Sequence, residues 1–380
     1  MTRYRFDQIA ENSTAKKKPE DSDRERYVGL EHLDPGTLEV TRWGAEVTPK
    51  GDKLLMERGD VLFGRRRAYQ KKVGIAPFDG IFSAHGMVLR PRTDVVDPDF
   101  FPFFISSDVF LDEAIRVSVG SLSPTANWKD LRVLEFSLPT LDKQRELAGI
   151  LSEAEQLKGC YRGLLATCDD IVKSQFVEMF EGKEYPSSCL STLVSSMRNG
   201  LSPSKSGSHR SKVLTLSAIT QGRFDSSAWK DGFFTEEPPA DKRVSNEDFY
   251  VCRGNGNKHL VGTGEYSNAP MKDMVFPDTM IAARIKQEQI ILPYLRCAWN
   301  QPSTRKQIEA SAKTTNGTFK INQTALGNIK LLVPPLELQQ EFADFATSVD
   351  KSKFAVQKAL DELNAMTKKI MNQELGLGDV

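Results

Sequence analysis

Two segments of the chain repeat apolar residues at the spacing of a long amphipathic helix. From residue 147 the apolar positions recur at steps of three and four, which is the pattern of a heptad seam. The predicted seam residues of this helix are Leu147, Ile150, Ala154, Leu157, Tyr161, Leu164, Cys168 and Ile171. The same phase returns 195 residues later, broken only at Ser352, with predicted seam residues Phe342, Phe345, Val349, Val356, Ala359, Leu363, Met366 and Ile370.

The repeat includes what precedes each helix. A strand-like segment runs into Pro139 in the first copy and into Pro334 and Pro335 in the second, and proline cannot sit in a helix interior. We therefore predict helices over 141–182 and 336–380, each with room for about 40 residues or about 60 Å at 1.5 Å per residue. Short β-rich runs between Gly, Pro and Asn predict mixed α/β domains over 1–140 and 183–335.

The fold class that follows is α+β, with two mixed α/β domains that are each followed by a long helix. The two helices are expected to pair as an antiparallel coiled coil with pseudo-two-fold symmetry. A parallel homodimer is the alternative, but two in-phase seams on one chain have a far higher effective concentration for each other than for a second molecule.

Composition limits the partners. The chain has 380 residues, 39% of them hydrophobic and 27% charged, which is ordinary for globular domains. Lys plus Arg and Asp plus Glu both number 51, so any surface for nucleic acid must be local. No apolar run approaches the ~20 residues of a membrane span, and we expect a cytoplasmic protein without a membrane partner. Five cysteines without a Cys-x-x-Cys pair make a zinc site unfavourable.

One basic loop in each copy suits DNA. It follows a predicted strand in the first copy and contains Arg65, Arg66, Arg67, Tyr69, Lys71 and Lys72. The equivalent place in the second copy has Arg253, Asn255, Asn257, Lys258 and His259. Arginine can pair with guanine, asparagine with adenine, and lysine can neutralise phosphate. The alternative is a solvated, charged surface loop.

Two further kinds of polar stretch correspond between the copies. Before the first strong strand of each domain lie Lys16 and Lys17, and Lys205 and Arg210. Before each final strand lies a loop rich in glycine and hydroxyl residues, with candidates Ser121, Ser123, Asn127, Lys313, Thr314, Asn316 and Lys320. Such loops permit close approach to phosphate or base edges, but they are equally well explained as connections between helix and strand.

Catalytic patterns are weak by comparison. The double prolines occur in Glu237-Pro238-Pro239-Ala240 and Val333-Pro334-Pro335-Leu336, neither of which is the Asn/Asp-Pro-Pro-aromatic loop of a DNA amino-methyltransferase. No Asp/Glu-x-Lys follows Pro98-Asp99 or Pro277-Asp278, and no complete Gly-x-Gly-x-x-Gly is present. The four histidines lie far apart. We therefore expect no catalytic residue, no metal and no cofactor.

The repeated order resembles the specificity subunit of a type I restriction-modification system. The residues that carry the resemblance are Leu138, Pro139, Leu141, Gln144 and Glu146, then Val333, Pro334, Pro335, Leu336, Gln339 and Glu341, with the Gly59-Asp60-Val61-Leu62 segment and the polar loops that end in Asn127 or Asn322. The resemblance implies that each globular unit is a target recognition domain that reads one half of a split DNA site. It also implies that the helices form a spacer and dock methyltransferase subunits.

The resemblance thus implies a non-catalytic subunit with three kinds of partner: double-stranded DNA, two methyltransferase subunits, and restriction and translocation subunits joined through the complex in defence against phage. Because the basic loops differ between the copies, the site should be asymmetric. Two alternatives remain open: a coiled-coil scaffold without a DNA role, and a DNA-cleaving or DNA-modifying enzyme in which one copy is degenerate.

Overall fold

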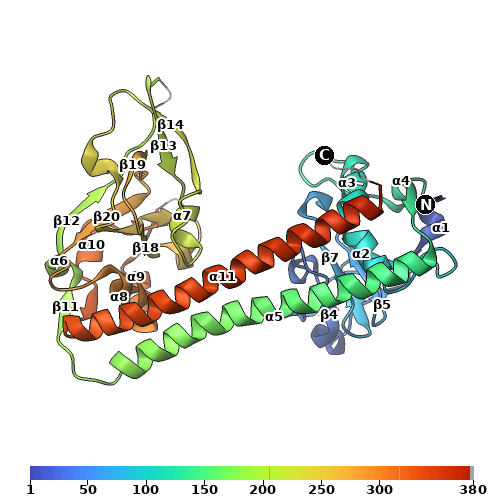
Figure 1. Ribbon diagram of the computed structural model, residues 1–380, viewed down its shortest axis with the longest axis horizontal. Helices are drawn as coiled ribbons and strands as arrows, with labels where there is room; N and C mark the ends of the chain where they lie inside the picture. The colour runs from blue at the N-terminus through green and yellow to red at the C-terminus, as the bar shows by residue number, and fades with distance from the viewer. Residues whose placement is uncertain (205, 316, 377–380) are drawn as a thin grey trace. The chain divides into compact units, whose positions relative to one another are not determined.

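The chain forms two compact units with long helices running through them. The computed structural model describes residues 1–204, 206–315 and 317–376. Unit 1 is Met1–Leu165 together with the chain from Ala355 onward, and unit 2 is Ala166–Phe354. Each unit therefore contains one mixed α/β domain and part of both long helices, α5 (Leu141–Phe180) and α11 (Leu336–Glu374) (Figure 1).

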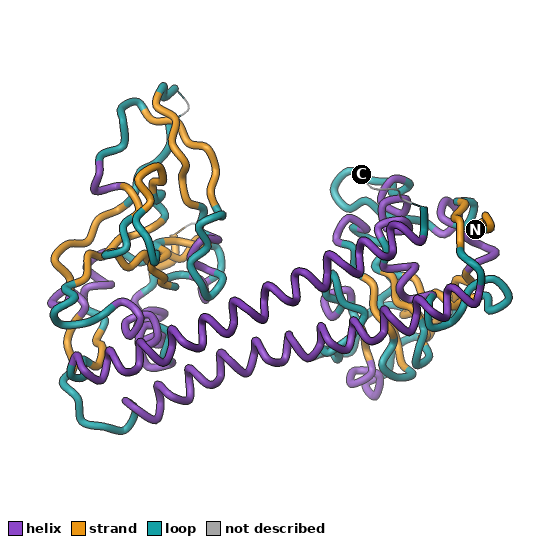
Figure 2. The backbone as a smooth tube through the Cα atoms, in the orientation of Figure 1, coloured by secondary structure: helices purple, strands orange, loops and turns teal. Residues whose placement is uncertain are grey.

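Unit 1 is built on two four-stranded sheets and one strand pair within the described residues (Figure 2). The first sheet has the order β2 (Ala10–Ser13), β9 (Met87–Pro91), β6 (Val61–Phe63) and β7 (Val73–Ile75). The second has the order β3 (Lys16–Lys17), β5 (Lys53–Met56), β8 (Gly80–Phe82) and β4 (Tyr27–Val28). The pair is β1 (Thr2–Arg5) with β10 (Glu135–Leu138), and the short helices are α1 (Phe6–Ile9), α2 (Phe101–Ser106), α3 (Asp108–Arg116), α4 (Trp128–Leu131), η1 (Asp21–Arg26), η2 (Leu30–His32) and η3 (Ala68–Gln70).

Unit 2 repeats most of this plan and has additional strands. Its first sheet has the order β12 (Val194–Asn199), β20 (Met280–Ile285), β16 (Asp248–Cys252) and β18 (Gly264–Tyr266). Its second has the order β14 (Trp229–Phe234), β13 (His209–Leu214), β19 (Met271–Val275) and β15 (Arg243–Val244). A strand pair joins β11 (Ser187–Cys189) to β23 (Lys330–Leu332), and a small extra sheet has the order β17 (Gly254–Asn255), β22 (Thr318–Lys320), β21 (Lys313–Thr315). Its short helices are α6 (Leu190–Leu193), α7 (Ser217–Thr220), α8 (Leu292–Trp299), α9 (Pro302–Ser311), α10 (Gln323–Gly327), η4 (Ala240–Lys242) and η5 (Lys258–Leu260).

The duplication predicted from sequence is visible in the strand pairing. In unit 1, β4 pairs parallel with β8, and in unit 2, β13 pairs parallel with β19, although most other pairs are antiparallel. A parallel pair needs a long crossover connection, so its recurrence at the same place in both copies indicates a common topology. The hairpin strand β14 is added at the edge of the second copy only.

The two long helices pair antiparallel within each unit. In unit 1, Lys158 on α5 donates from Nζ to Thr367 Oγ1 on α11 at 2.8 Å. In unit 2, Lys353 Nζ on α11 lies 2.5 Å from Asp169 Oδ1 on α5. The middle of α5 therefore meets the end of α11, and the end of α5 meets the middle of α11, as an antiparallel pair requires. The predicted antiparallel pairing is confirmed.

The predicted seam of α5 is wrong at every second position. Leu147, Ala154 and Cys168 are buried, but the intervening predicted residues expose 43–46% of their surface; these are Ile150, Leu157, Leu164 and Ile171. The buried or half-buried positions lie one residue later, at Leu151, Lys158, Leu165 and Val172. The seam therefore advances by four and then three residues from Leu147. The predicted set combined one row of seam residues, spaced by seven, with a neighbouring row, or column, of exposed residues at the same spacing.

The same shift occurs in α11. Phe342 is fully buried and Val349 is half-buried, whereas Met366 is 52% exposed. Leu360 and Thr367 are buried, each one residue after a predicted seam position. Lys158 and Lys353 occupy equivalent places in the two seams, 195 residues apart. A polar residue at a seam position specifies register at a cost in stability, so the pair of lysines favours the observed alignment.

Each domain shares its core with the helices. The core of unit 1 includes Phe104 and Phe136 together with Leu147 and Leu151 of α5 and Met371 of α11. In unit 2, the rings of Phe176 and Phe180 on α5 lie 5.4 and 5.6 Å from that of Phe342 on α11. The helices α5 and α11 thus contribute side chains to the core of each domain. Among the described residues, the helices lack a stretch long and apolar enough to cross a membrane.

Candidate nucleic-acid interface

In unit 1 the basic loop after β6 is bonded to the polar loop that precedes α4. The main-chain nitrogen of Arg67 donates to Pro124 O at 2.6 Å, and that of Ala126 donates to Arg65 O at 3.0 Å. The side chain of Arg67 also donates from Nε to Ser123 Oγ at 3.3 Å. Two loops that are separate in the sequence therefore form one surface, which we call surface 1 (residues 65–70, His85 and 119–126).

The exposed side chains of surface 1 include those best suited to bases. Arg66 and Arg67 are exposed, and Tyr69 is 52% exposed. Arg66 Nη1 lies 3.3 Å from His85 Nε2. Partial burial, followed by the charges of Arg66, Arg65 and Lys53, lowers the pKa of His85. A neutral imidazole can accept a hydrogen bond from Arg66, which fixes the direction of the guanidinium.

Three predicted DNA-binding cations are engaged inside unit 1. Arg65 Nη2 lies 3.4 Å from Ala84 O, and Lys72 Nζ donates to Leu30 O at 2.6 Å. Lys71 Nζ lies 2.7 Å from Asp108 Oδ1 and 2.8 Å from an Asp112 carboxylate oxygen. Partial burial opposes the charge of Lys71, but the two carboxylates outweigh it and raise its pKa. We therefore assign these three cations to the support of surface 1.

In unit 2 the equivalent loops join through the small sheet. Gly254 pairs with Lys320 and Asn255 with Phe319 across β17 and β22, while Lys313 pairs with Lys320 across β21 and β22. The strands β21 and β22 are thus antiparallel neighbours, and β22 also pairs with β17. This arrangement gathers a second surface, surface 2, from the predicted residues Asn255, Asn257, Lys258, His259, Lys313, Thr314 and Lys320.

Asn257 and His259 of surface 2 also make contacts within unit 2. Asn257 Oδ1 accepts from the main-chain nitrogen of His259 at 3.0 Å and so caps η5. His259 Nδ1 lies 3.4 Å from Glu309 Oε1. Lys258, Lys313 and Lys320 are exposed. Lys205 and Asn316, also predicted to bind DNA, lie outside the described residues.

The first arginine of each loop has the same structural role. Arg253 Nη1 donates to Asp278 O at 3.1 Å, just as Arg65 Nη2 reaches Ala84 O. Both carbonyls belong to the turn before the next sheet strand, β20 or β9. Arg65 and Arg253 therefore hold the reading loops against that turn.

The other predicted DNA-binding residues lie on β3, on β13 or in the loop before α4. Lys17, on β3, pairs with Asp23 at 3.1 Å, and Lys16 is exposed on the same strand. Arg210, on β13, pairs with Asp231 at 2.9 Å. Ser121 is exposed in surface 1, and the main-chain carbonyl of Asn127 accepts from the first turn of α4.

Sequence reasoning missed the part of surface 1 that is not basic. His85 is one of the four histidines that lie far apart in the sequence, and it contacts Arg66. Val119 and Leu122 are 66% and 90% exposed in the loop that Arg67 holds. Apolar side chains beside arginines are suited to contact a thymine methyl group. The available sequence signal was the alternation of apolar residues with Gly and Ser in 117–124.

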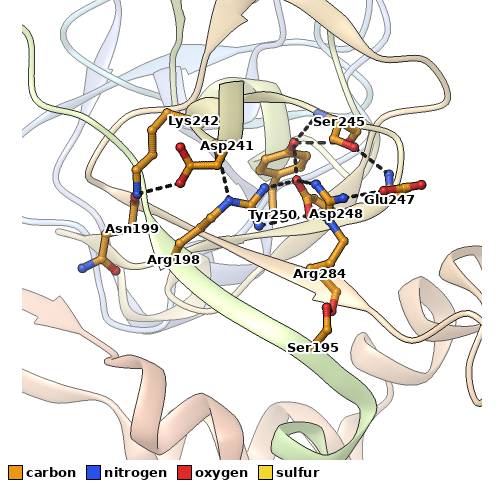
Figure 3. Close-up of polar contacts among 10 residues, drawn as sticks. All are labelled: Ser195, Arg198, Asn199, Asp241, Lys242, Ser245, Glu247, Asp248, Tyr250 and Arg284. Carbon is orange, nitrogen blue, oxygen red and sulfur yellow. Dashed lines mark hydrogen bonds and ion pairs between the residues drawn. The ribbon is translucent and has the colours of Figure 1, made fainter. Parts of the chain in front are cut away.

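An Asp–Arg ion pair lies at the start of the strand that precedes each reading loop. Asp60 accepts from Arg90 Nε at 2.7 Å in unit 1, and Asp248 accepts from Arg284 Nε at 2.6 Å in unit 2. Asp248 is fully buried and also contacts Arg198 of β12, so one carboxylate joins three strands (Figure 3). Each pair ties the start of the strand that leads into a reading loop, β6 or β16, to a neighbouring strand.

Asp248→Ala should destabilise unit 2 by about 3–5 kcal/mol, because it leaves Arg198 and Arg284 without their shared buried carboxylate. Scanning calorimetry of the purified chain measures the loss. Asp170→Ala is the matched control: its ion pair with Lys173 is largely exposed, and such pairs contribute about 0–1 kcal/mol. Equal shifts in both variants would contradict a structural role for Asp248.

Two cysteines of the described residues have strongly shifted pKa values. Burial raises the pKa of the Cys252 thiol and of the Cys297 thiol to about 11 in each case. Both are therefore protonated at neutral pH, whereas a nucleophilic cysteine is a thiolate. Within the part of the chain that the structure describes, His, Cys, Asp and Glu side chains form no group of three that could hold a metal ion.

Known proteins match the sequence at the level of family. Residues 4–159 match the model of the type I restriction modification DNA specificity domain. The StySPI specificity subunit of Salmonella potsdam is 24% identical over 371 residues, covering 86% of this chain and 74% of that protein. The EcoDI specificity subunit of Escherichia coli is 25% identical over 194 residues, covering 47% of this chain and 41% of that protein.

A solved structure has the same fold. The type I restriction-modification S subunit from M. genitalium aligns over 100% of this chain and 96% of its own, with a TM-score of 0.54 and 15% identity. The repeated domains, the antiparallel helices and these matches agree with each other. Residues 4–159 thus belong to the family of type I restriction modification DNA specificity domains, and most of the chain is similar to type I restriction enzyme specificity subunits.

Proposed function

We propose that the chain gives sequence specificity to a type I restriction-modification complex, with surface 1 and surface 2 each reading one half of a bipartite DNA site. The observation that carries the proposal is the joining of two distant loops in each unit, through Arg67 and Pro124 in unit 1 and through Asn255 and Phe319 in unit 2. In both units the joined loops present exposed cationic or amide side chains, which are the groups that contact bases and phosphates.

The two half-sites should differ in sequence. Surface 1 presents Arg66 and Arg67 with apolar Leu122, whereas surface 2 presents lysines and asparagines on a small sheet. Arginine favours guanine and asparagine favours adenine. Two unlike donor sets do not read the same bases, which favours an asymmetric site.

The proposed subunit is non-catalytic and carries no cofactor. Methyltransferase subunits would bind S-adenosylmethionine, flip the target base and transfer the methyl group. Because positive and negative residues are equal at 51 each, the chain alone should bind DNA weakly, and the assembled complex would complete the positive channel around the duplex. The complex acts on DNA in the cytoplasm.

The exposed column of α5 is suited to docking a methyltransferase subunit. In unit 1 it consists of Ile150, Leu157 and Leu164, spaced by seven residues and each 43–46% exposed. Two heptads of large apolar side chains on one helix face are unusual on a solvated surface and are typical of a helix-in-groove contact. We propose that this column, the α5 stripe, binds a methyltransferase subunit.

Mapping methylated bases in cells that express this chain with its methyltransferase tests the proposed function. We expect methylation at one bipartite sequence with two unlike halves, and no methylation at that sequence in cells with the methyltransferase alone. Exchanging residues 65–70 and 117–126 for those of another specificity subunit should change one half only. Methylation that is independent of this chain would contradict the proposal and favour a scaffold.

A further inference from the structure

A buried glutamine bonds each domain to the first turn of its long helix. Gln144 of α5 is 1% exposed and Gln339 of α11 is fully buried. The two residues are 195 positions apart and each lies three residues after the first residue of its helix, Leu141 or Leu336. They therefore occupy the same position in the two copies.

In unit 1 the side chain of Gln144 has three main-chain partners. Its Oε1 accepts from Asp97 N at 2.8 Å, and its Nε2 donates to Val95 O at 3.2 Å and to Pro139 O at 2.9 Å. Val95 and Asp97 belong to the turn between β9 and α2, and Pro139 lies directly before α5. One amide thus holds the domain and the start of the helix together.

In unit 2 the same three bonds are present. Gln339 Oε1 accepts from Ile291 N at 3.0 Å, and its Nε2 donates to Gln289 O at 3.1 Å and to Pro334 O at 2.8 Å. A primary amide has two N–H donors and one carbonyl acceptor, so all of them are used in both copies. Glutamate would lack the donors, and asparagine would be one methylene too short.

The directional character of these bonds separates them from the surrounding core. Apolar contact between domain and helix, as at Leu147 in unit 1 or Phe342 in unit 2, is non-directional and tolerates small rotations. Hydrogen bonds to three main-chain atoms weaken steeply when their angles change. The glutamines are thus the contacts best able to fix the angle between each domain and its helix.

We propose that Gln144 and Gln339 are positioning residues that hold each recognition domain at one angle on its helix and so set the spacing of half-sites that the subunit accepts. The inference rests on the proposed function, because a spacing preference has meaning only for a bipartite DNA site. It assigns to the glutamines a role in selecting DNA geometry, in addition to their contribution to stability.

The test compares the assembled complex with wild-type chain, Gln144→Leu, Gln339→Leu and the control Gln340→Leu. Gln340 is exposed, and its Nε2 donates to Asp344 Oδ1 at 2.9 Å. Methylation rates are measured on DNA in which the spacer is one base pair shorter, native or one longer. We expect each glutamine variant to lower discrimination against the altered spacers by at least about tenfold, or about 1.4 kcal/mol, and Gln340→Leu to leave it unchanged.

Two further measurements separate positioning from folding. Hydrogen exchange should be faster at the Asp97 amide in Gln144→Leu and at the Ile291 amide in Gln339→Leu, with the other unit unaffected. Gln144→Glu, which keeps the acceptor but loses both donors, should relax spacer choice as Gln144→Leu does. A lower melting temperature with an unchanged spacer profile would overturn the inference, as would unchanged exchange at both amides. Absence of a bipartite site in the wild type would instead overturn the proposed function. The exchange data would still test whether each glutamine holds its domain on the helix.

Discussion

The double variant Arg66→Ala, Arg67→Ala should make the assembled complex insensitive to the sequence of one half-site. Both guanidinium groups are exposed on surface 1 and each is oriented by one contact, with His85 or with Ser123. A bidentate arginine–guanine pair contributes about 1–3 kcal/mol of discrimination, so losing two should cost about two to four orders of magnitude in preference. Binding to DNA libraries with one half randomised measures that preference for each half separately.

Arg65→Ala is the matched control for this experiment. Its guanidinium faces Ala84 O in the turn before β9. The change should therefore lower stability, and any effect on recognition would come from displacement of the loop, not from a lost base contact. If the double variant instead weakens binding equally on all sequences and lowers the salt dependence, Arg66 and Arg67 contact phosphate. Unchanged discrimination at both half-sites would contradict the assignment of surface 1.

The outline of the fold was predictable because each copy carries the same local signals. Pro139 and Pro335 exclude helix before Leu141 and Leu336, and the helices begin at those residues. Asp60 and Asp248 stand at equivalent places in the two copies, five residues before Arg65 and Arg253, but the sequence does not show why. Each carboxylate pairs with an arginine on a neighbouring strand, Arg90 or Arg284, and the pairing of strands is not encoded in local spacing.

The roles of individual cations could not be predicted for the same reason. Lys71 and Arg66 are both basic residues of one loop, yet Lys71 pairs with Asp108 and Asp112 of α3 while Arg66 stays exposed. The partners of Lys71 lie 37 and 41 residues further along the chain. Composition identified the loop as basic, but only tertiary contacts separate the supporting residues from the reading residues.

The helix seam shows a different limit of sequence patterns. The apolar residues of α5 form two adjacent columns, one with Leu147 and Ala154 and one with Leu157 and Leu164. Periodicity alone gives both columns a heptad spacing and does not say which column faces α11. Lysine is almost never fully buried unless it is paired, yet Lys158 is buried and bonded to Thr367. The misassigned column is the α5 stripe.

Leu157→Glu with Leu164→Glu should leave the chain folded and remove a methyltransferase subunit from the complex. Both residues are exposed in the isolated chain, so their replacement should change stability by no more than about 0.5 kcal/mol. In an apolar groove each carboxylate would be buried without a partner, and residues at the centre of such contacts contribute about 2 kcal/mol or more. If the complex holds two methyltransferase subunits, as the resemblance implies, native mass spectrometry of the co-expressed complex should show two with the wild-type chain and one with the double variant.

The expected loss of one subunit, and not of both, follows from comparison of the helices. At the positions of α11 equivalent to Leu157 and Leu164 stand Ser352 and Ala359, so α11 presents a weaker apolar column and its contact with a second methyltransferase cannot depend on the same side chains. Gln156→Glu, at an exposed position beside the stripe, is the control and should keep both subunits. Two bound methyltransferases in the double variant would show that docking does not use the α5 stripe, and Phe354→Glu with Met366→Glu on α11 would then test the other exposed apolar residues.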